Sequence, residues 1–317
     1  MAYSKRGFVL EGKRVWVAGH KGMVGSAISR RLRPENCEIV TVSRDECDLT
    51  NQQQVTNWIT HSKPQIVVVA AAKVGGILAN DTYPVDFLYN NLAIQNNIIK
   101  ASFDAGIEKL LFLGSSCIYP KMAPQPIVES ALLTGPLEPT NEWYAVAKIA
   151  GIKLCQAYMR QYGARFVSAM PTNLYGPFDN FDLHSSHVIP ALIRKAHAAK
   201  LRGEVDLNIW GSGSPLREFL HVDDLADAAV FVLKHYEDYE HINIGSGTDL
   251  SIADTARLVM EVVGLTGQLT YDTSKPDGTP RKLMAADKLK GMGWTPKITL
   301  KEGLRSTYEW FLENVEI

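Results

Sequence analysis

The stretch VWVAGHKGMVGSAISRRL, residues 15–32, decides the fold of this chain. It opens on an apolar run typical of a buried strand, continues through Gly19, Gly22 and Gly25, and ends in a segment with helical periodicity. Glycine lets a backbone turn tightly and approach a pyrophosphate, and a helix N-terminus supplies free N–H groups and a positive dipole end. A structural turn is the alternative, but the strand–turn–helix context favours a dinucleotide-binding site.

The first two thirds of the chain alternate short β-branched runs with longer helical stretches, as in a parallel sheet with crossover helices. We expect strands at residues 14–18, 38–42, 66–70, 109–113 and 166–170. We expect helices at residues 23–32, 87–105 and 142–162. The pattern predicts an α/β fold built on a doubly wound parallel sheet.

A change of lobe is expected after PTNLYGP, residues 171–177, because an irregular loop rich in Asn, Asp, His and Ser follows. We predict a dinucleotide-binding domain over residues 10–178 and a smaller α/β lobe over residues 179–215 and 246–317. Residues 216–245 contain a helix that Asp223 or Asp224 would cap, and this segment fits either lobe.

Composition excludes several classes of protein. The 317 residues are 46% hydrophobic and 21% charged, with a net charge of −1, so we expect a folded protein with no general affinity for nucleic acid. No segment reaches the roughly 18 apolar residues of a membrane span, and no signal peptide is evident. The four cysteines lack the spacing of a disulfide framework or a metal site. These features predict a soluble, cytoplasmic protein.

The type of dinucleotide is indicated by the end of the second expected strand. An NAD enzyme usually carries an acidic residue there for the ribose hydroxyls, whereas this chain has Arg44. A guanidinium can hold a 2′-phosphate through its forked donors, and Lys21 could assist, so the sequence favours NADP. The alternative is a solvated loop charge, because Asp45 and Glu46 follow at once.

Three residues suggest a catalytic group. Tyr144 and Lys148 are four apart and share one helix face, and an ammonium beside a phenol lowers the phenol pKa. Ser115 follows an apolar strand, at the sheet edge where active sites of open α/β folds gather. A Tyr-Lys pair alone is common on helix surfaces, but its combination with Ser115 and the glycine-rich turn is specific.

Longer motifs extend this pattern over most of the chain. They are GHKGMVG, AAKVGGI, FLGSSCIYP, EPTNEWYAVAKIAGIK, MPTNLYGP, SHVIPALI, REFLHVDD and SKPDGTPRK. With them the chain resembles the extended short-chain dehydrogenase/reductases, which have a Rossmann domain, and among these the epimerase-reductases of nucleotide sugars. The resemblance implies that NADPH and GDP-4-keto-6-deoxy-D-mannose react to give GDP-L-fucose. It also implies a homodimer built from the helices around residues 87–105 and 142–162.

By the same resemblance, one site first inverts ring carbons 3 and 5 of a 4-keto sugar and then reduces the ketone. Cys117 and His187 would be the acid–base pair of the inversion, although alone they would more often be a buried small hydrophobe and a polar loop residue. Tyr144 would protonate the oxygen, oriented by Ser115, while Lys148 tunes Tyr144 and holds the nicotinamide ribose.

The cofactor and substrate contacts are predicted as follows. The expected cofactor-binding residues are Gly19, His20, Lys21, Gly22, Met23, Val24, Gly25, Arg44, Leu113, Gly114, Ser115, Ser116, Tyr144, Lys148, Pro171, Thr172, Asn173, Leu174 and His187. Lys195 and Arg217 are candidates for the GDP phosphates, Trp210 for stacking on the base or sugar, and Asp277 for accepting hydrogen bonds. Core packing for Trp210 and an ion pair for Arg217 are the alternatives.

Two further possibilities remain beside this interpretation. His221 with Asp223 and Asp224 could suggest a metal site, but a helix-capping cluster is the better interpretation and we expect no metal. The main rival function is a 4-epimerase or 4,6-dehydratase that regenerates bound NAD. A dehydratase typically has carboxylates next to the catalytic serine position, where this chain has Cys117. A non-catalytic NADP sensor would not need the Ser-Tyr-Lys group.

Overall fold

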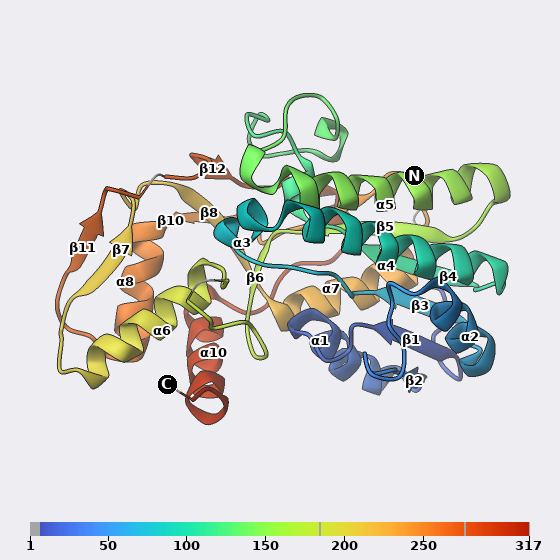
Figure 1. Ribbon diagram of the computed structural model, residues 1–317, viewed down its shortest axis with the longest axis horizontal. Coiled ribbons are helices and arrows are strands. Elements are labelled where there is room, and N and C mark those ends of the chain that lie inside the picture. Colours follow the sequence, from blue (N-terminus) through green and yellow to red (C-terminus); the bar gives the residue numbers. More distant parts are fainter. Residues whose placement is uncertain (1–6, 184, 276, 317) are drawn as a thin grey trace.

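A computed structural model describes residues 7–183, 185–275 and 277–316 (Figure 1). Its centre is a parallel sheet of six strands in the order β2-β1-β3-β4-β5-β9. The strands are β1 (Arg14–Ala18), β2 (Glu38–Val40), β3 (Ile66–Val69), β4 (Lys109–Leu113), β5 (Phe166–Pro171) and β9 (Ile242–Ile244). The predicted doubly wound α/β class is confirmed, with β2 ending two residues earlier than expected.

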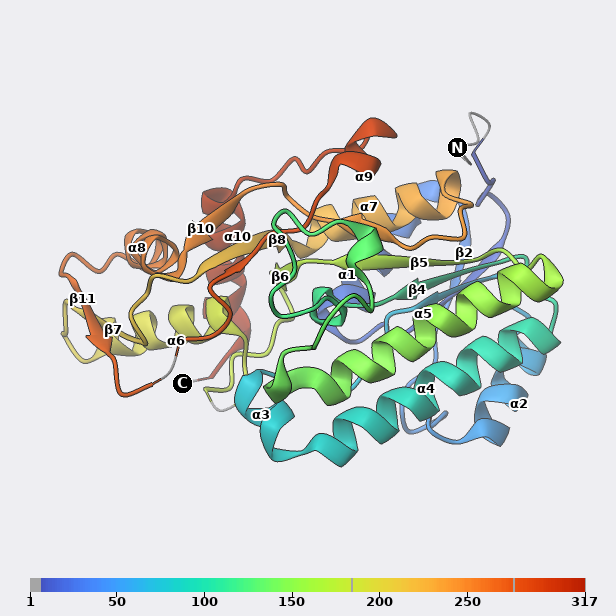
Figure 2. The same cartoon turned by 90° about the horizontal axis from the view of Figure 1, so that it is seen from above.

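Helices cover both faces of this sheet, as Figure 2 shows. The helices α1 (Met23–Leu32) and α7 (Val222–His235) share one apolar core with the sheet. On the other face lie α2 (Gln52–Ser62), α4 (Pro84–Asp104) and α5 (Glu142–Tyr162). In β1 the side chains alternate between the two cores: Val15 and Val17 face one, Trp16 and Ala18 the other. Burial on both faces explains why these strands are almost wholly apolar.

A second lobe lies beside this domain, on the left of Figure 1. Its strands are β6 (Asn173–Tyr175), β7 (Leu207–Trp210), β8 (Leu216–His221), β10 (Asp249–Ser251), β11 (Leu269–Asp272) and β12 (Arg281–Lys282). The helices α6 (Val188–Leu201), α8 (Ile252–Val263) and α10 (Leu300–Asn314) enclose a third apolar core. Residues 216–245 serve both lobes, because β8 pairs with β10 and β12 while α7 and β9 pack in the first domain.

The capping expectation for α7 is wrong. His221 is the N-cap, and its Nδ1 accepts a hydrogen bond from the Asp223 N–H at 3.2 Å. Asp224 instead accepts from the backbone N–H groups of Lys297 and Ile298, which fixes the chain between α9 (Asp287–Gly291) and α10. A histidine with a neutral ring nitrogen can satisfy a helix N–H as a carboxylate does.

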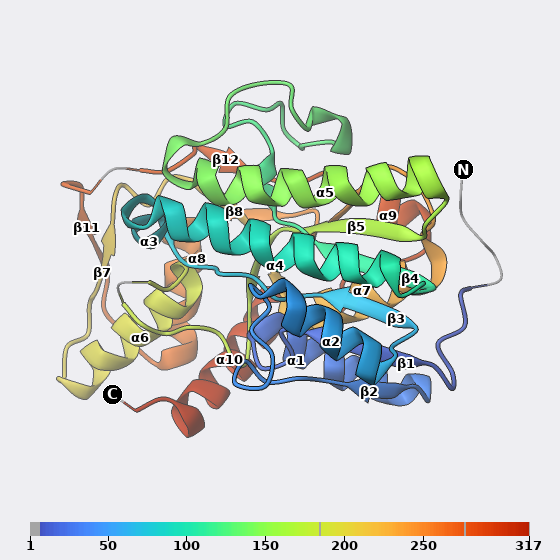
Figure 3. The same cartoon turned by 45° about the vertical axis from the view of Figure 1, so that its right-hand side comes forward.

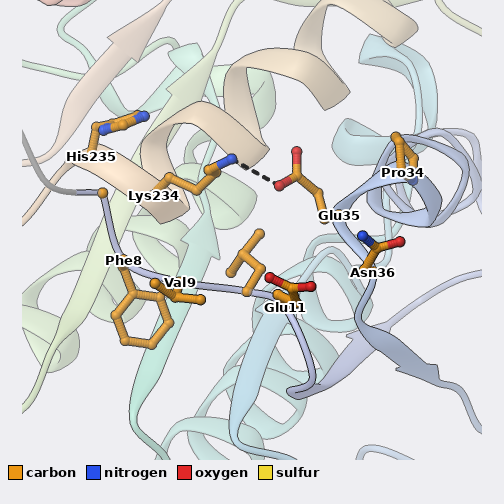
Figure 4. Close-up of a pocket in the computed structure, with 10 residues that line it drawn as sticks. Phe8, Val9, Glu11, Pro34, Glu35, Asn36, Lys234 and His235 are labelled. Carbon is orange, nitrogen blue, oxygen red and sulfur yellow. Dashed lines mark hydrogen bonds and ion pairs between the residues drawn. The ribbon is translucent and has the colours of Figure 1, made fainter.

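The chain before β1 packs against the end of α7. The backbone N–H of Phe8 donates to the Lys234 carbonyl at 2.6 Å, and the Phe8 ring lies near the buried Lys109 ammonium. A surface pocket of about 420 Å³ opens between residues 7–11 and α7, with the Lys234–Glu35 ion pair at 2.8 Å in its wall (Figure 4). This pocket is lined by none of the predicted site residues.

Nowhere in residues 7–183, 185–275 and 277–316 does a helix have the length and apolarity of a membrane span.

Candidate active site

Two of the three glycines of the turn, Gly19 and Gly25, leave no room for a side chain. Gly19 has a φ of +90°, and a Cβ there would lie 2.7 Å from the Ala71 nitrogen. A Cβ on Gly25 would lie 2.1 Å from the Gly19 carbonyl oxygen, so helix α1 packs directly on the turn. Helix α1 begins after Gly22, which is exposed, and its first turn carries no acidic residue. The turn therefore fits a pyrophosphate, which the free N–H groups and the helix dipole would stabilise.

A second turn, after β2, lies next to this one. Glu46 accepts hydrogen bonds from the N–H and Oγ of Ser43, at 3.0 and 2.7 Å, and these bonds lower the pKa of Glu46. The charges of Lys21 and His20 lower it further, which places the two turns within electrostatic reach. Arg44 is exposed beside them. The charge of Arg44 acts on Asp48, whereas Glu46 is bonded to Ser43. A role of Arg44 as a 2′-phosphate contact stays a prediction.

Replacement of Arg44 by alanine is expected to weaken NADPH binding selectively. Loss of a hydrogen bond between charged groups costs about 1.5 to 3 kcal/mol, roughly tenfold or more in affinity. Titration of NADPH and NADH against the wild type, Arg44→Ala and the exposed control Arg33→Ala measures the effect. An equal loss of affinity for NADPH and NADH would show that Arg44 does not bind the 2′-phosphate.

The carboxyl end of β4 and the N-terminal half of α5 bring Ser115, Tyr144 and Lys148 together. Lys148 is only 3% exposed, and its Nζ donates to the Leu113 carbonyl at 2.9 Å. The same Nζ lies 5.7 Å from the centre of the Tyr144 ring. Ser115 is the N-cap of a short 3-10 helix over Ser116–Ile118. The carboxyl end of β4 and the first turns of α5 thus place a hydroxyl, a phenol and an ammonium at one edge of the sheet.

Burial sets the protonation states of this group. It lowers the pKa of Lys148 to about 8, an effect that the Cys117 charge opposes. It raises the pKa of Tyr144 above the ordinary value, and the Cys117 charge raises it further. The expectation that Lys148 would lower the Tyr144 pKa is therefore wrong for this structure, in which the ammonium bonds to a backbone carbonyl. Tyr144 is protonated at neutral pH, as a proton donor must be.

Cys117 lies within the same group. The thiol is 7% exposed, and burial raises its pKa, whereas Lys282, Ser115 and Lys148 act in the opposite direction. Lys282 stands on β12, next to Arg217 on β8, and burial lowers its own pKa. The sequence interpretation missed Lys282 although it ends the motif SKPDGTPRK. Its position beside Cys117 depends on pairing between strands far apart in the chain.

His187 comes from the second lobe. It is the N-cap residue of α6, and burial lowers its pKa, so the imidazole is neutral at pH 7. The loop before it touches the segment after β3, where the Gly76 N–H donates to the Ser185 carbonyl at 2.8 Å. His187 therefore borders the first domain although its helix belongs to the other lobe.

The predicted nicotinamide loop bridges the two lobes. Pro171 ends β5, and the Thr172 N–H donates to the Ile244 carbonyl of β9 at 3.0 Å. Asn173 and Leu174 then form β6, which pairs with β8. The Asn173 Nδ2 donates to the Glu218 carbonyl at 2.8 Å. These contacts place the four predicted residues where the central sheet meets the smaller lobe.

Aromatic and charged side chains gather on the second lobe. Trp210 is 54% exposed, which excludes core packing, and Lys195 and Lys275 lie 4.5 and 5.5 Å from its ring centre. Asp277 accepts hydrogen bonds from the Ser212 N–H and Oγ, and its charge acts on the partly buried Arg217. Lys275 was not predicted. An exposed ring with two flanking cations suits a flat base and a phosphate.

The cluster of His221, Asp223 and Asp224 has structural roles. His221 caps α7, Asp224 holds residues 297 and 298, and Asp223 pairs with Arg30 at 2.7 Å. Throughout the described part of the chain, no three His, Cys, Asp or Glu side chains are grouped so that they could hold a metal ion.

Comparisons with known proteins agree with this geometry. Residues 15–245 match the model of the NAD dependent epimerase/dehydratase family. The GDP-L-fucose synthase of Sinorhizobium fredii is 63% identical, over 97% of this chain and 98% of the relative. That of Escherichia coli is 53% identical, over 95% and 97%. The crystal structure of a GDP-L-fucose synthetase from Naegleria fowleri bound to NADP has a TM-score of 0.89 at 29% identity, covering 98% of each chain.

Proposed function

This chain belongs to the NAD dependent epimerase/dehydratase family, and we propose that it is an NADPH-dependent epimerase-reductase that converts GDP-4-keto-6-deoxy-D-mannose to GDP-L-fucose. One observation carries the proposal: the structure groups Cys117 with the Ser115, Tyr144 and Lys148 set. That group combines the residues of ketone reduction with a thiol able to exchange protons beside the ketone.

The inversion steps use the acidity of the protons beside the ketone. A base removes a proton from ring carbon 3 or 5, and an acid on the opposite face returns one, so the carbon inverts. Cys117 from the first domain and His187 from the second lobe supply the two groups. Burial raises the pKa of Cys117 although the charges of Lys282 and Lys148 oppose it, so the thiol carries a proton that it can return, while His187 is neutral and able to accept one. The Ser115 and Tyr144 hydroxyls stabilise the negative charge that develops on the ketone oxygen.

The reduction uses the same oxygen site. NADPH, when bound at the glycine-rich turn, supplies the hydride. Tyr144 donates its proton to the oxygen, and Ser115 orients that oxygen by a hydrogen bond. Lys148 lies close to both the Tyr144 ring and the end of β4, and it would hold the nicotinamide ribose. Its positive charge lies beside the phenolate that remains when Tyr144 has donated its proton. One oxyanion site thus serves inversion and reduction.

The smaller lobe would bind the sugar nucleotide. Lys195 and Arg217 would meet its diphosphate, because guanidinium and ammonium groups are the usual phosphate partners. Trp210 would stack on the base or sugar, and its exposed ring supports that role. Asp277 would accept hydrogen bonds from the ligand in exchange for those of Ser212.

The use of NADPH separates this function from its rivals. We expect one NADPH to be oxidised for each molecule of GDP-4-keto-6-deoxy-D-mannose converted. A 4-epimerase or 4,6-dehydratase regenerates its cofactor, so turnover without net oxidation of NADPH would favour those enzymes. A non-catalytic NADP sensor would show no turnover at all.

A homodimer is part of the proposal. The helices α4 and α5 pack side by side, with α3 (Ile77–Thr82) at one end (Figure 3). Val85 and Tyr89 of α4 are 74% and 67% exposed, and Trp143 and Val146 of α5 are also exposed. Exposed apolar side chains on two helices that pack side by side are typical of a subunit interface.

Replacement of Tyr89 by lysine is expected to weaken the dimer, because a charge would enter an apolar interface. The dissociation constant measured by analytical ultracentrifugation should rise by about tenfold or more. Leu201→Lys, at an exposed apolar position on α6, is the matched control. A wild type that sediments as a monomer would contradict the dimer.

A cytoplasmic location is also proposed, on the state of the cysteines. All four are free thiols, and Cys47, Cys117 and Cys155 are buried. A reducing compartment maintains thiols in this state.

A further inference from the structure

The motif AAKVGGI, which no predicted role explains, forms a fixed segment after β3. Asn91 of α4 is 2% exposed, and its side chain bonds both backbone groups of Lys73, accepting from the N–H at 2.9 Å and donating to the carbonyl at 3.0 Å. Asn80 of α3 donates from its Nδ2 to the carbonyls of Gly75 and Gly76, at 2.8 and 3.0 Å. Buried amides thus hold residues 73–76 at both ends.

This segment touches the loop that precedes His187. Besides the hydrogen bond from Gly76 to the Ser185 carbonyl, a Cβ on Gly76 would lie 2.6 Å from the Ser186 carbonyl oxygen. Gly76 has a φ of −65°, which any residue adopts, so glycine is needed here for close approach alone. A larger residue would displace the loop or the segment.

The contact is transmitted directly to His187. Asp182 Oδ1 accepts from the N–H and Oγ of Ser185, at 3.0 and 2.9 Å, and the Asp182 carbonyl accepts from the Ser186 N–H at 2.9 Å. Ser186 is followed at once by His187, whose carbonyl accepts the first hydrogen bond of α6 from Ala191. The Ser186 carbonyl that faces Gly76 is joined directly to the His187 nitrogen, so a shift of that carbonyl would also move His187.

The same segment also borders the reduction site. A Cβ on Gly75 would lie 3.1 Å from the Phe87 ring, and that ring meets the Tyr144 ring edge-on with centres 6.4 Å apart. In Figure 1, α3 lies at the junction of the two lobes. The segment therefore connects the domain that carries Tyr144 with the loop that carries His187.

We propose that Gly76 is a positioning residue for the epimerisation: it lets the segment after β3 dock on the Ser185–Ser186 backbone and so fixes His187 at the sugar ring. The inference rests on the proposed function, because it takes His187 as an acid–base group. Hydride transfer does not need that imidazole, so the two reactions should respond differently to a change at Gly76.

Gly76→Ala tests the inference. We expect deuterium exchange at the carbons beside the ketone, measured without NADPH, to fall by about tenfold or more, since a misplacement near 1 Å can cost about 100-fold. Oxidation of GDP-L-fucose by NADP⁺, which needs only hydride transfer, should stay within about twofold of the wild-type rate. Gly291→Ala in α9, whose Cβ would meet nothing within 4 Å, is the matched control.

Asn80→Asp provides an independent variant. It keeps the side-chain shape but replaces the donor that holds Gly75 and Gly76 with an acceptor, so it should show the same split between exchange and oxidation. Exchange as fast as in the Gly291→Ala control, or equal losses in both reactions, would overturn the positioning role. A wild type that exchanged no deuterium would overturn the proposed function itself, and this inference with it.

Discussion

Tyr144→Phe is expected to slow hydride transfer by about 100-fold or more, the usual scale for loss of a positioned proton donor. Phenylalanine keeps the ring that packs against Phe87 but has no proton for the developing oxyanion. The wild-type phenol is protonated at neutral pH, and burial raises its pKa further. Single-turnover oxidation of NADPH by the keto sugar measures the step.

The control for this variant is Tyr158→Phe, on the same helix α5 but within an aromatic cluster with Phe103. It should leave the rate nearly unchanged. A Tyr144→Phe enzyme that reduces the ketone at close to the wild-type rate, while binding cofactor normally, would show that another group supplies the proton.

Cys117→Ser and His187→Asn should remove the epimerisation and spare hydride transfer. Each substitution leaves a side chain of similar shape that is a much poorer acid or base, so deuterium uptake beside the ketone should fall by about 100-fold. Reduction of the ketone that has not been inverted should persist, giving a product with unchanged stereochemistry at those carbons. Exchange from heavy water without NADPH, followed by NMR, measures the loss.

Matched controls are available on the surface of the first domain. Cys37 is partly buried next to the end of α1, and His61 is exposed on α2. The variants Cys37→Ser and His61→Asn should exchange deuterium at the wild-type rate. If the two site variants also exchanged at that rate, the acid–base chemistry would belong to other residues, and Cys117 would keep only a packing role.

Local sequence patterns predicted the central domain well because its determinants are local. Apolar runs that are buried on both faces are visible without knowledge of their partners. Gly25 is required by its contact with the nearby Gly19, and Gly19 by the chain that directly follows β3. The end of β4 and the Tyr144–Lys148 face of α5 follow from the same periodicities. Family resemblance, not spacing, selected Cys117 and His187.

The residues that were missed depend on contacts between distant parts of the chain. Lys282 acts on Cys117 only because β12 pairs with β8, and Lys275 reaches Trp210 only because β11 pairs with β7. The pKa of Tyr144 could not be inferred from its spacing to Lys148. Spacing shows that two groups share a helix face, but not that one of them bonds to the Leu113 carbonyl or that burial dominates.

The central claim is that one site inverts two carbons and then reduces the ketone with NADPH. Incubation of the protein with GDP-4-keto-6-deoxy-D-mannose and NADPH in heavy water, followed by NMR of the product, tests it most directly. The expected product is GDP-L-fucose with deuterium at ring carbons 3 and 5 and hydrogen from NADPH at carbon 4. A reduced product without deuterium at those carbons, or a product formed without oxidation of NADPH, would contradict the claim.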